Sequence, residues 1–329
     1  MKRIGLVVAL VGLVLAVAAG AAPVKIGICQ IVEHPALDAV RQGVIDGLKD
    51  AGYSEGVNVE YLIANAQGDM SNAALIAQNF RAQGVDLVVA IATGMALAVA
   101  EVYRGAETPV VFSAITDPVS YALVKSATDP SENGNITGVS DLIDVAADLA
   151  ILKEIGAKRV GIVYNPGEPN SDVLTKTAKQ AAPGLGLSIV EAVADSTANV
   201  PLAAQSLLGR VDALYVTTDN TVVSAIDAVV AVANDAKVPF LVADPTSLKF
   251  GPAVATGFDY YEHGKITAGV VAAILGGKRP NQIPVTYQTG SQVHLNLDTA
   301  AEIGLTFPQA LVEKATSIYY GGHEWEKVQ

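Results

Sequence analysis

Polar side chains follow most of the short apolar runs in this 329-residue chain, at positions where binding or chemistry could occur. They are mainly hydroxyls, amides and carboxylates, and neither lysine nor arginine occurs among them. In chain order they are Gln30, Glu33 and His34; Thr93, Gly94 and Met95; Ser113, Thr116 and Asp117; Tyr164, Asn165, Glu168, Asn170 and Ser171; Thr218, Asp219 and Asn220; Asp244 and Thr246; and Asp259, Tyr260 and Tyr261. A phosphate or other dianion normally recruits a basic side chain, so this set disfavours such ligands.

The set suits a ligand that carries both a carboxylate and an ammonium group. Thr93, Gly94 and Met95 precede a helical pattern, and free N–H groups at a helix N-terminus bind anions without a basic side chain. Ser171 could add a hydroxyl donor, while Asp219 and Asp259 could hold the ammonium group. The residues therefore indicate an α-amino acid. A sugar or nucleoside is the alternative, because Asp, Asn and Thr also bind hydroxyl groups.

Both aspartates have a purely structural alternative. Asp219, together with Asn220, could cap the helix that contains Val222, and Asp259 could cap the helix that follows it, since these residue types are preferred at helix N-caps. The sequence leaves the two roles open.

Signatures of catalysis and of metal binding are missing from the sequence. His34, His263, His294 and His323 show no metal-ligand spacing and have no cysteine partners. No G-x-S-x-G, P-loop or H-E-x-x-H motif occurs. Glu33 and Asp117 as an acid/base pair remain the least favoured alternative. We expect a protein that is not an enzyme and that uses neither a cofactor nor a metal.

The elements that must position these residues alternate along the chain. Apolar runs at residues 24–29, 57–63, 86–91, 109–112 and 136–139 predict strands. Between the first two, Leu37, Val40, Val44 and Leu48 recur at helical spacing. This alternation predicts an α/β fold with parallel sheets, in which ligands bind outside the carboxyl ends of the strands.

The same order then starts again about 130 residues later. The strand beginning at Lys25 matches one at Arg159, Val85 matches Val211, and Pro109 matches Pro239. The order predicts two Rossmann-like lobes facing each other across a cleft, with several hinge crossovers. A helix at 260–275 and strands at 284–287 and 291–295 return the chain to each lobe. We expect lobe 1 to contain residues 22–138 and 259–286, and lobe 2 residues 139–258 and 287–329.

The start of the chain predicts export. Lys2 and Arg3 precede an uncharged apolar run that ends in small residues, which is typical of a signal peptide covering residues 1–21; a retained anchor is the competing interpretation. The single cysteine, Cys29, lies within the next strand, so we expect neither disulfides nor a lipid anchor. The net charge of −12 argues against nucleic-acid binding.

Several segments together resemble ABC-transporter substrate-binding proteins of the tryptophan/tyrosine/phenylalanine-binding type, over essentially the whole mature chain. They are EHPALD at 33–38, residues 92–93, AITDP at 114–118, NITGVSD at 135–141, residues 170–171 and 219–221, and Asp259. The resemblance implies a type I periplasmic binding protein that closes on an amino acid, aromatic or large and apolar, and delivers it to an ABC permease with its ATPase.

The resemblance also implies where the ligand lies. Its carboxylate would meet the Thr93 region and Ser171, and its ammonium Asp219 and Asp259, with Gln30 and Asn220 nearby. The set we expect to contact ligand is Gln30, Glu33, Thr93, Gly94, Met95, Ala114, Thr116, Asp117, Tyr164, Asn170, Ser171, Asp219, Asn220 and Asp259. Met95 departs from the family pattern and could narrow the pocket or pack on an apolar ligand. We expect a free monomer in the periplasm.

Overall fold

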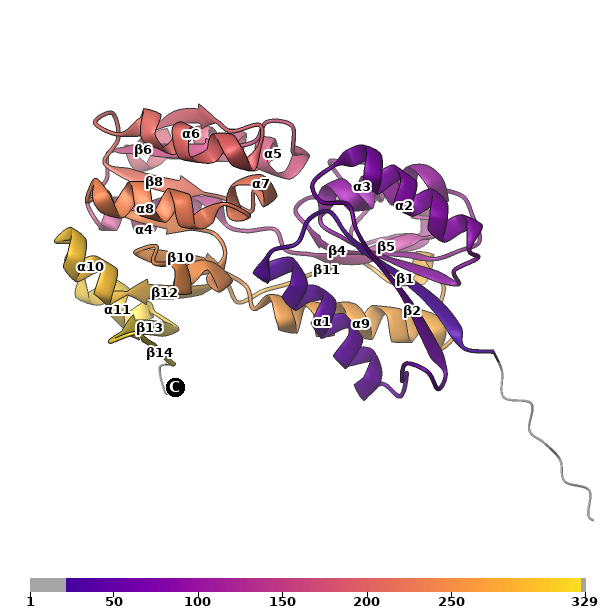
Figure 1. The fold of residues 1–329 in the computed structure, drawn as a ribbon. Helices are drawn as coiled ribbons and strands as arrows, with labels where there is room; N and C mark the ends of the chain where they lie inside the picture. The colour runs from indigo at the N-terminus through magenta and orange to yellow at the C-terminus, as the bar shows by residue number, and fades with distance from the viewer. Residues whose placement is uncertain (1–21, 327–329) are drawn as a thin grey trace, which may run out of the picture.

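The computed structural model describes residues 22–326, so the expected signal peptide lies outside the described part of the chain. Figure 1 shows two lobes, each built around one sheet with helices packed against it. No helix within residues 22–326 is long and apolar enough to cross a membrane. The predicted α/β class is confirmed.

The first lobe contains a six-stranded sheet. Its strands are β1 (Val24–Gln30), β2 (Val59–Asn65), β3 (Leu87–Ile91), β4 (Val110–Ile115), β5 (Ile136–Ser140) and β11 (Thr286–Tyr287). Its helices are α1 (Pro35–Asp50), α2 (Met70–Ala82), α3 (Thr93–Tyr103) and α9 (Tyr260–Leu275), with short 3-10 turns η1 (Pro130–Glu132) and η5 (Pro280–Gln282). Every strand pair of this sheet is parallel, and β3 is buried throughout, as expected for a sheet covered on both faces.

The second lobe contains an eight-stranded sheet. Its strands are β6 (Arg159–Tyr164), β7 (Ser188–Val193), β8 (Ala213–Val216), β9 (Phe240–Val242), β10 (Val254–Gly257), β12 (Gln292–Asn296), β13 (Ser317–Tyr320) and β14 (His323–Glu326). Its helices are α4 (Val145–Glu154), α5 (Pro169–Ala181), α6 (Val200–Leu207), α7 (Asn220–Val223), α8 (Ile226–Asp235), α10 (Leu297–Ile303) and α11 (Gln309–Lys314), with 3-10 turns η2 (Ala182–Leu185), η3 (Thr197–Asn199) and η4 (Pro245–Phe250). Only β10–β12 and β13–β14 pair antiparallel within the described strands.

The two sheets repeat one topology. The first runs β11-β5-β4-β3-β1-β2, and the second contains the run β10-β9-β8-β6-β7. Strands β1, β3 and β4 therefore correspond to β6, β8 and β9, which are the three matches predicted from the sequence. Because the carboxyl ends of parallel strands share one edge, each lobe presents its strand-end loops together.

Within residues 22–326 the chain passes between the lobes three times. It crosses after β5, again between β10 and α9, and finally between β11 and β12. Strand β5 continues to Ser140 and β11 to Tyr287 in the first sheet, beyond the lobe boundaries at 138 and 286 expected from the sequence. Gln288 joins these crossings, since its N–H donates to the Ser140 carbonyl and its Nε2 donates to the Asp259 carbonyl.

Helices α1 and α9 pack closely side by side in Figure 1. A Cβ on Gly43 would lie 2.1 Å from the Tyr261 carbonyl oxygen, and a Cβ on Gly264 would lie 2.2 Å from the Val40 carbonyl. Only glycine permits this approach. The contact holds the N-termini of both helices at the same edge of the first lobe.

Candidate functional site

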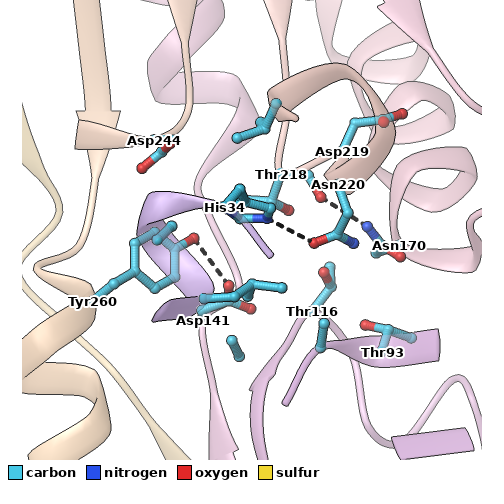
Figure 2. A pocket seen from close by; sticks show the side chains of 15 residues that line it. His34, Thr93, Thr116, Asp141, Asn170, Thr218, Asp219, Asn220, Asp244 and Tyr260 are labelled. Atoms are coloured by element: carbon cyan, nitrogen blue, oxygen red, sulfur yellow. Dashed lines mark hydrogen bonds between the residues drawn. The ribbon is translucent and has the colours of Figure 1, made fainter. Parts of the chain in front are cut away.

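A cavity of about 390 Å³ lies between the lobes and is shown in Figure 2. Its walls come from the segments that follow strands of both sheets and from the first turns of α5 and α9. The lining residues are His34, Ala36, Leu37, Ala92, Thr93, Ala114, Thr116, Asp141, Asn170, Thr218, Asp219, Asn220, Val223, Asp244 and Tyr260.

Asp219 is fully buried in the second lobe, and its carboxylate is occupied by protein donors. Oδ2 accepts hydrogen bonds from the Asn165 N–H at 2.6 Å and the Ser171 hydroxyl at 2.5 Å, and Oδ1 accepts one from the Val222 N–H at 2.8 Å. Burial, reinforced by the charge of Glu168, raises the pKa of Asp219 to about 7 against the effect of these bonds. Asp219 therefore caps α7 as well as lining the cavity.

Glu168 fixes the first turn of α7. Its carboxylate accepts from the N–H and hydroxyl of Thr221 and from the N–H and Nδ2 of Asn220. Because Nδ2 of Asn220 faces Glu168, its Oδ1 must face the cleft, where it lies 3.2 Å from His34 Nε2. His34 is then the donor. This hydrogen bond joins the two lobes across the cavity, as Figure 2 shows.

A second hydrogen bond joins the lobes outside the cavity. The Tyr121 hydroxyl of the first lobe donates to the Pro169 carbonyl, at the start of α5, at 3.0 Å. Hydrogen bonds therefore join the two lobes at two places in the described structure, one in the cavity wall and one outside the cavity.

Asp141 is the least compensated carboxylate of the cavity. It is buried where the chain first leaves the first lobe, and the Tyr260 hydroxyl donates to its Oδ2 at 3.1 Å (Figure 2). Its Oδ1 has no hydrogen-bond partner in the described structure. Burial raises the pKa of Asp141. A buried carboxylate without a cationic partner is costly and favours a ligand that brings positive charge.

His263 is fully buried, is bonded to the lining residue Ala114, and is held in its neutral form. Its Nε2 accepts the Ala114 N–H at 2.9 Å, and its Nδ1 lies 2.6 Å from the Gln288 side-chain oxygen. An acceptor Nε2 carries no proton, so Nδ1 is the donor. Burial also lowers the pKa of His263. His263 therefore orients Ala114 and the hinge residue Gln288, and it is no counter-ion for Asp141.

Asp244 is the third carboxylate of the cavity and is well satisfied. Its Oδ1 accepts from the N–H and hydroxyl of Thr246, at 2.9 and 2.8 Å, and its Oδ2 accepts from the Ser247 hydroxyl at 2.6 Å. These bonds place Asp244 as the N-cap of η4.

The cavity lining also offers neutral hydrogen-bond donors. Helix α3 begins at Thr93, and its N-cap residue Ala92 has no side chain able to cap it. The first N–H groups of α3 are therefore open to an anion. Thr116 and Thr218 add hydroxyl groups. Ala92 and Ala114 have φ of 75° and 55°, a strained conformation for residues other than glycine that recurs at binding sites.

The structure brings six of the residues expected from the sequence to the cavity. They are Thr93, Ala114, Thr116, Asn170, Asp219 and Asn220. The other eight lie outside its lining.

Four of these eight have local roles in the fold. Gln30 is buried and forms hydrogen bonds with Asp38 and Arg41. Asp117 accepts hydrogen bonds from the N–H groups of Val119 and Ser120, and Ser171 donates one to Asp219. Asp259 caps α9 by accepting hydrogen bonds from the N–H groups of Tyr261 and Glu262. Glu33 is exposed, and Tyr164 packs against the core of the second lobe.

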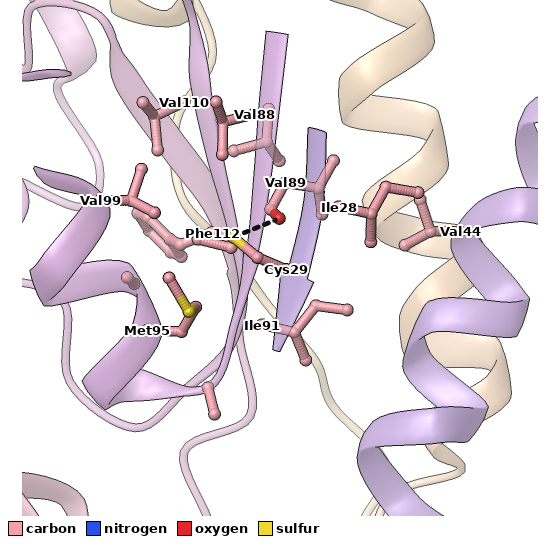
Figure 3. Packing of buried hydrophobic residues seen from close by; sticks show 14 of the residues in the cluster. Ile28, Cys29, Val44, Val88, Val89, Ile91, Met95, Val99, Val110 and Phe112 are labelled. Atoms are coloured by element: carbon pink, nitrogen blue, oxygen red, sulfur yellow. Dashed lines mark hydrogen bonds between the residues drawn. The ribbon is translucent and has the colours of Figure 1, made fainter. Parts of the chain in front are cut away.

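Met95 is fully buried in the core of the first lobe. Figure 3 shows it with Val99 and Phe112 on the side of the sheet where Cys29 also lies. Gly94 lines a second, larger cavity of about 1180 Å³ between the lobes, which shares Asn170 and Asn220 with the first. Met95 therefore shapes the site only through the packing of α3.

Several lining residues were absent from the expected contact set. His34, Thr218, Asp244 and Tyr260 were already among the polar residues at strand ends, and Asp141 lies in the NITGVSD segment of the resemblance. The signal for Asp141 was its position directly after the fifth strand. No cluster of metal-ligating side chains occurs within residues 22–326.

Known proteins resemble this chain over nearly its full length. Residues 25–319 match the family described as ABC transporter substrate binding protein. A tyrosine-binding protein of Clostridioides difficile is 36% identical over 84% of this chain and 79% of its own.

Two solved structures extend the comparison. A Streptococcus pneumoniae ABC domain in complex with L-Trp has a TM-score of 0.85 at 30% identity and covers 90% of this chain and 100% of that one. A ligand-free, open substrate-binding protein of Clostridium difficile has a lower TM-score of 0.67, at 33% identity over 90% and 98% of the two chains. The structure of this chain is thus more similar overall to the ligand-bound relative than to the open one. The chain belongs to the family of ABC-transporter substrate-binding proteins.

Proposed function

We propose that this chain is the extracytoplasmic solute-binding component of an ABC importer and binds an α-amino acid between its lobes. The observation that carries the proposal is Asp141, a buried carboxylate in the cavity wall with an oxygen that lacks a partner. An α-ammonium group would supply the missing donor and the missing charge. The uncapped start of α3 at Thr93 supplies N–H donors for the α-carboxylate.

The rest of the lining suits an aromatic or large apolar side chain. Ala36, Leu37, Ala92, Ala114 and Val223 present apolar surface and small side chains. The named ligands of the relatives, tyrosine and L-Trp, support this choice.

Ligand binding would stabilise the closed arrangement of the lobes. The cavity takes residues from both lobes, so a bound amino acid contacts His34 on one side and Asn220 on the other. A ligand shifts a two-state equilibrium by its differential affinity for the two states. We expect a monomer that hands its ligand unchanged to a permease driven by an ATPase.

Export to the periplasm, with cleavage after residue 21 and no lipid anchor, completes the proposal. The only cysteine, Cys29, is buried in β1, which makes it unsuited to carry a lipid. Intact mass measurement of the exported protein tests this part, and a mass that includes residues 1–21 would contradict it.

A thermal-shift screen tests the binding function. The twenty amino acids, simple sugars and nucleosides are added separately to the purified mature protein. A ligand at 100 times its Kd stabilises the fold by about 2.7 kcal/mol, so an aromatic amino acid should give a clear shift. Stabilisation by a sugar or nucleoside, with no shift from any amino acid, would contradict the proposal. Recovery of a chemically altered ligand would contradict the absence of catalysis.

A further inference from the structure

The cavity has an uneven distribution of charge. Three buried carboxylates line it, namely Asp141, Asp219 and Asp244, and no lysine or arginine is among the lining residues of the described chain. An amino acid zwitterion is neutral overall, so it matters which of its two charged groups the cavity holds more firmly.

The carboxylates differ in how far the protein already satisfies them. Asp219 accepts three hydrogen bonds from protein donors, and Asp244 accepts from Thr246 and Ser247 with both oxygens. Asp141 accepts one, from the Tyr260 hydroxyl, and its Oδ1 accepts none. Asp141 is therefore the group that gains most from a cationic ligand.

The described lining offers Asp141 no lysine or arginine, and the lining histidine, His34, is bonded to Asn220. A positive charge on His263 would lower the pKa of Asp141, but His263 Nε2 accepts the Ala114 N–H, which keeps the ring neutral. Burial raises the pKa of Asp141, so the empty cavity can reduce its charge by taking up a proton, and a bound ammonium group would replace that proton.

Apart from His34, whose Nε2 already donates to Asn220, the described lining offers the ligand carboxylate neutral donors. These are the N–H groups at the start of α3 and the hydroxyls of Thr93, Thr116 and Thr218. The bonds of either ligand group would be charge-assisted, since each group is ionised. Only the ammonium group, however, also meets a group of opposite charge, the Asp141 carboxylate, and the attraction between two opposite charges is strengthened by burial. The ammonium group therefore contributes more to binding than the carboxylate does.

We propose that this cavity recognises the ammonium group ahead of the carboxylate, so that it accepts aromatic primary amines that lack a carboxylate and rejects the corresponding acids that lack an amine. The inference rests on the proposed function and deepens it, because it extends the ligand class from amino acids to their decarboxylated amines.

Calorimetry with two matched series tests the inference. The first is L-tyrosine, tyramine and 3-(4-hydroxyphenyl)propanoate; the second is L-tryptophan, tryptamine and 3-indolepropanoate. In the series whose amino acid binds, we expect the amine to bind about 10-fold more weakly and the acid at least 100-fold more weakly. An acid that binds as well as the amine would overturn the inference while the proposed function stands. If neither amino acid binds, the inference fails; the proposed function fails as well only if none of the twenty amino acids binds in the thermal-shift screen.

Asp141→Asn separates the role of the charge from that of the fold. The variant should lose affinity for the amine and gain affinity for the acid. The ratio of the Kd of the acid to the Kd of the amine should therefore fall by at least 10-fold. Asp259→Asn is the matched control, since Asp259 is exposed outside the cavity and asparagine also caps helices. Melting curves verify that both variants fold. An unchanged amine-to-acid ratio in Asp141→Asn would overturn the inference.

Discussion

Replacement of Asp141 by asparagine should have opposite effects on ligand affinity and on the stability of the ligand-free protein. The substitution removes the charge and leaves the volume nearly unchanged. Asparagine can still accept the hydrogen bond from Tyr260. What it cannot do is form a charge-assisted bond with the ligand ammonium through the partnerless Oδ1 position.

The magnitude follows from that single bond. A hydrogen bond to a charged group contributes about 1.5–3 kcal/mol, which corresponds to roughly 10- to 150-fold in Kd. The empty protein, by contrast, loses a buried charge that no cation compensates. Its free energy of unfolding at neutral pH should therefore rise, by about 1 kcal/mol.

Isothermal calorimetry and urea denaturation measure the two effects on the same preparation. Asp259→Asn provides the discriminating control, because the family resemblance implies that Asp259 contacts the ligand ammonium, whereas the structure has it outside the cavity as the cap of α9. The reasoning is refuted if Asp259→Asn weakens binding as expected here for Asp141→Asn while Asp141→Asn leaves the Kd unchanged.

Three further predictions concern residues that do not line the cavity. Tyr121→Phe removes the bond to Pro169 outside the cavity and should raise the Kd about two- to tenfold through a less stable closed state; calorimetry checks it, and an affinity change as large in the exposed control Tyr320→Phe would count against the reason given. Gln288→Leu leaves the buried Nδ1–H of His263 without an acceptor and should reduce the free energy of unfolding by about 1–3 kcal/mol; an unchanged urea midpoint would contradict this role. Burial raises the pKa of Asp148 from 3.8 to about 6, so the folded state binds a proton that the unfolded state releases between about pH 4 and 6, and stability should fall by about 3 kcal/mol as pH rises across that window. Asp148→Asn should remove this component of the pH dependence, and parallel stability curves for the two proteins would disprove it.

The repeated strand order was the most predictable part of the fold. Buried parallel strands are short apolar runs, so matches such as Lys25 with Arg159 could be aligned without any contact information, and the sheets follow that alignment. Helix α9 was predicted at 260–275 and is observed as Tyr260–Leu275, because an N-cap aspartate and a terminal glycine frame its apolar pattern.

Side-chain direction was less predictable than position along the chain. Thr93 lines the cavity while Met95 lies in the core. Two residues along a helix rotate the side chain by about 200°, so the outcome depends on the residue at which α3 begins. The neighbouring residues Asp259 and Tyr260 also differ in role, since Tyr260 lies in the cavity wall whereas Asp259 caps α9.

The sequence could not show which polar side chains are already bonded to other protein groups and which remain free to bond a ligand. Asp219 and Ser171 were both expected to contact the ligand, but they bond to each other, and Ser171 lies outside the cavity lining. Asp141 becomes the open acceptor only because its neighbours in space, Tyr260 and His263, leave one oxygen without a partner. That arrangement depends on the first and second lobe crossings meeting at one point of the hinge.

A crystal structure of the protein with its best-binding aromatic amino acid tests the central claim most directly. The account predicts that the ligand lies between the lobes with its ammonium nitrogen about 2.7–3.2 Å from Asp141 Oδ1 and its carboxylate at the N–H groups that begin α3. A ligand whose ammonium lies on Asp259, or one bound outside the cavity lined by His34, Asp141 and Asn220, would contradict it.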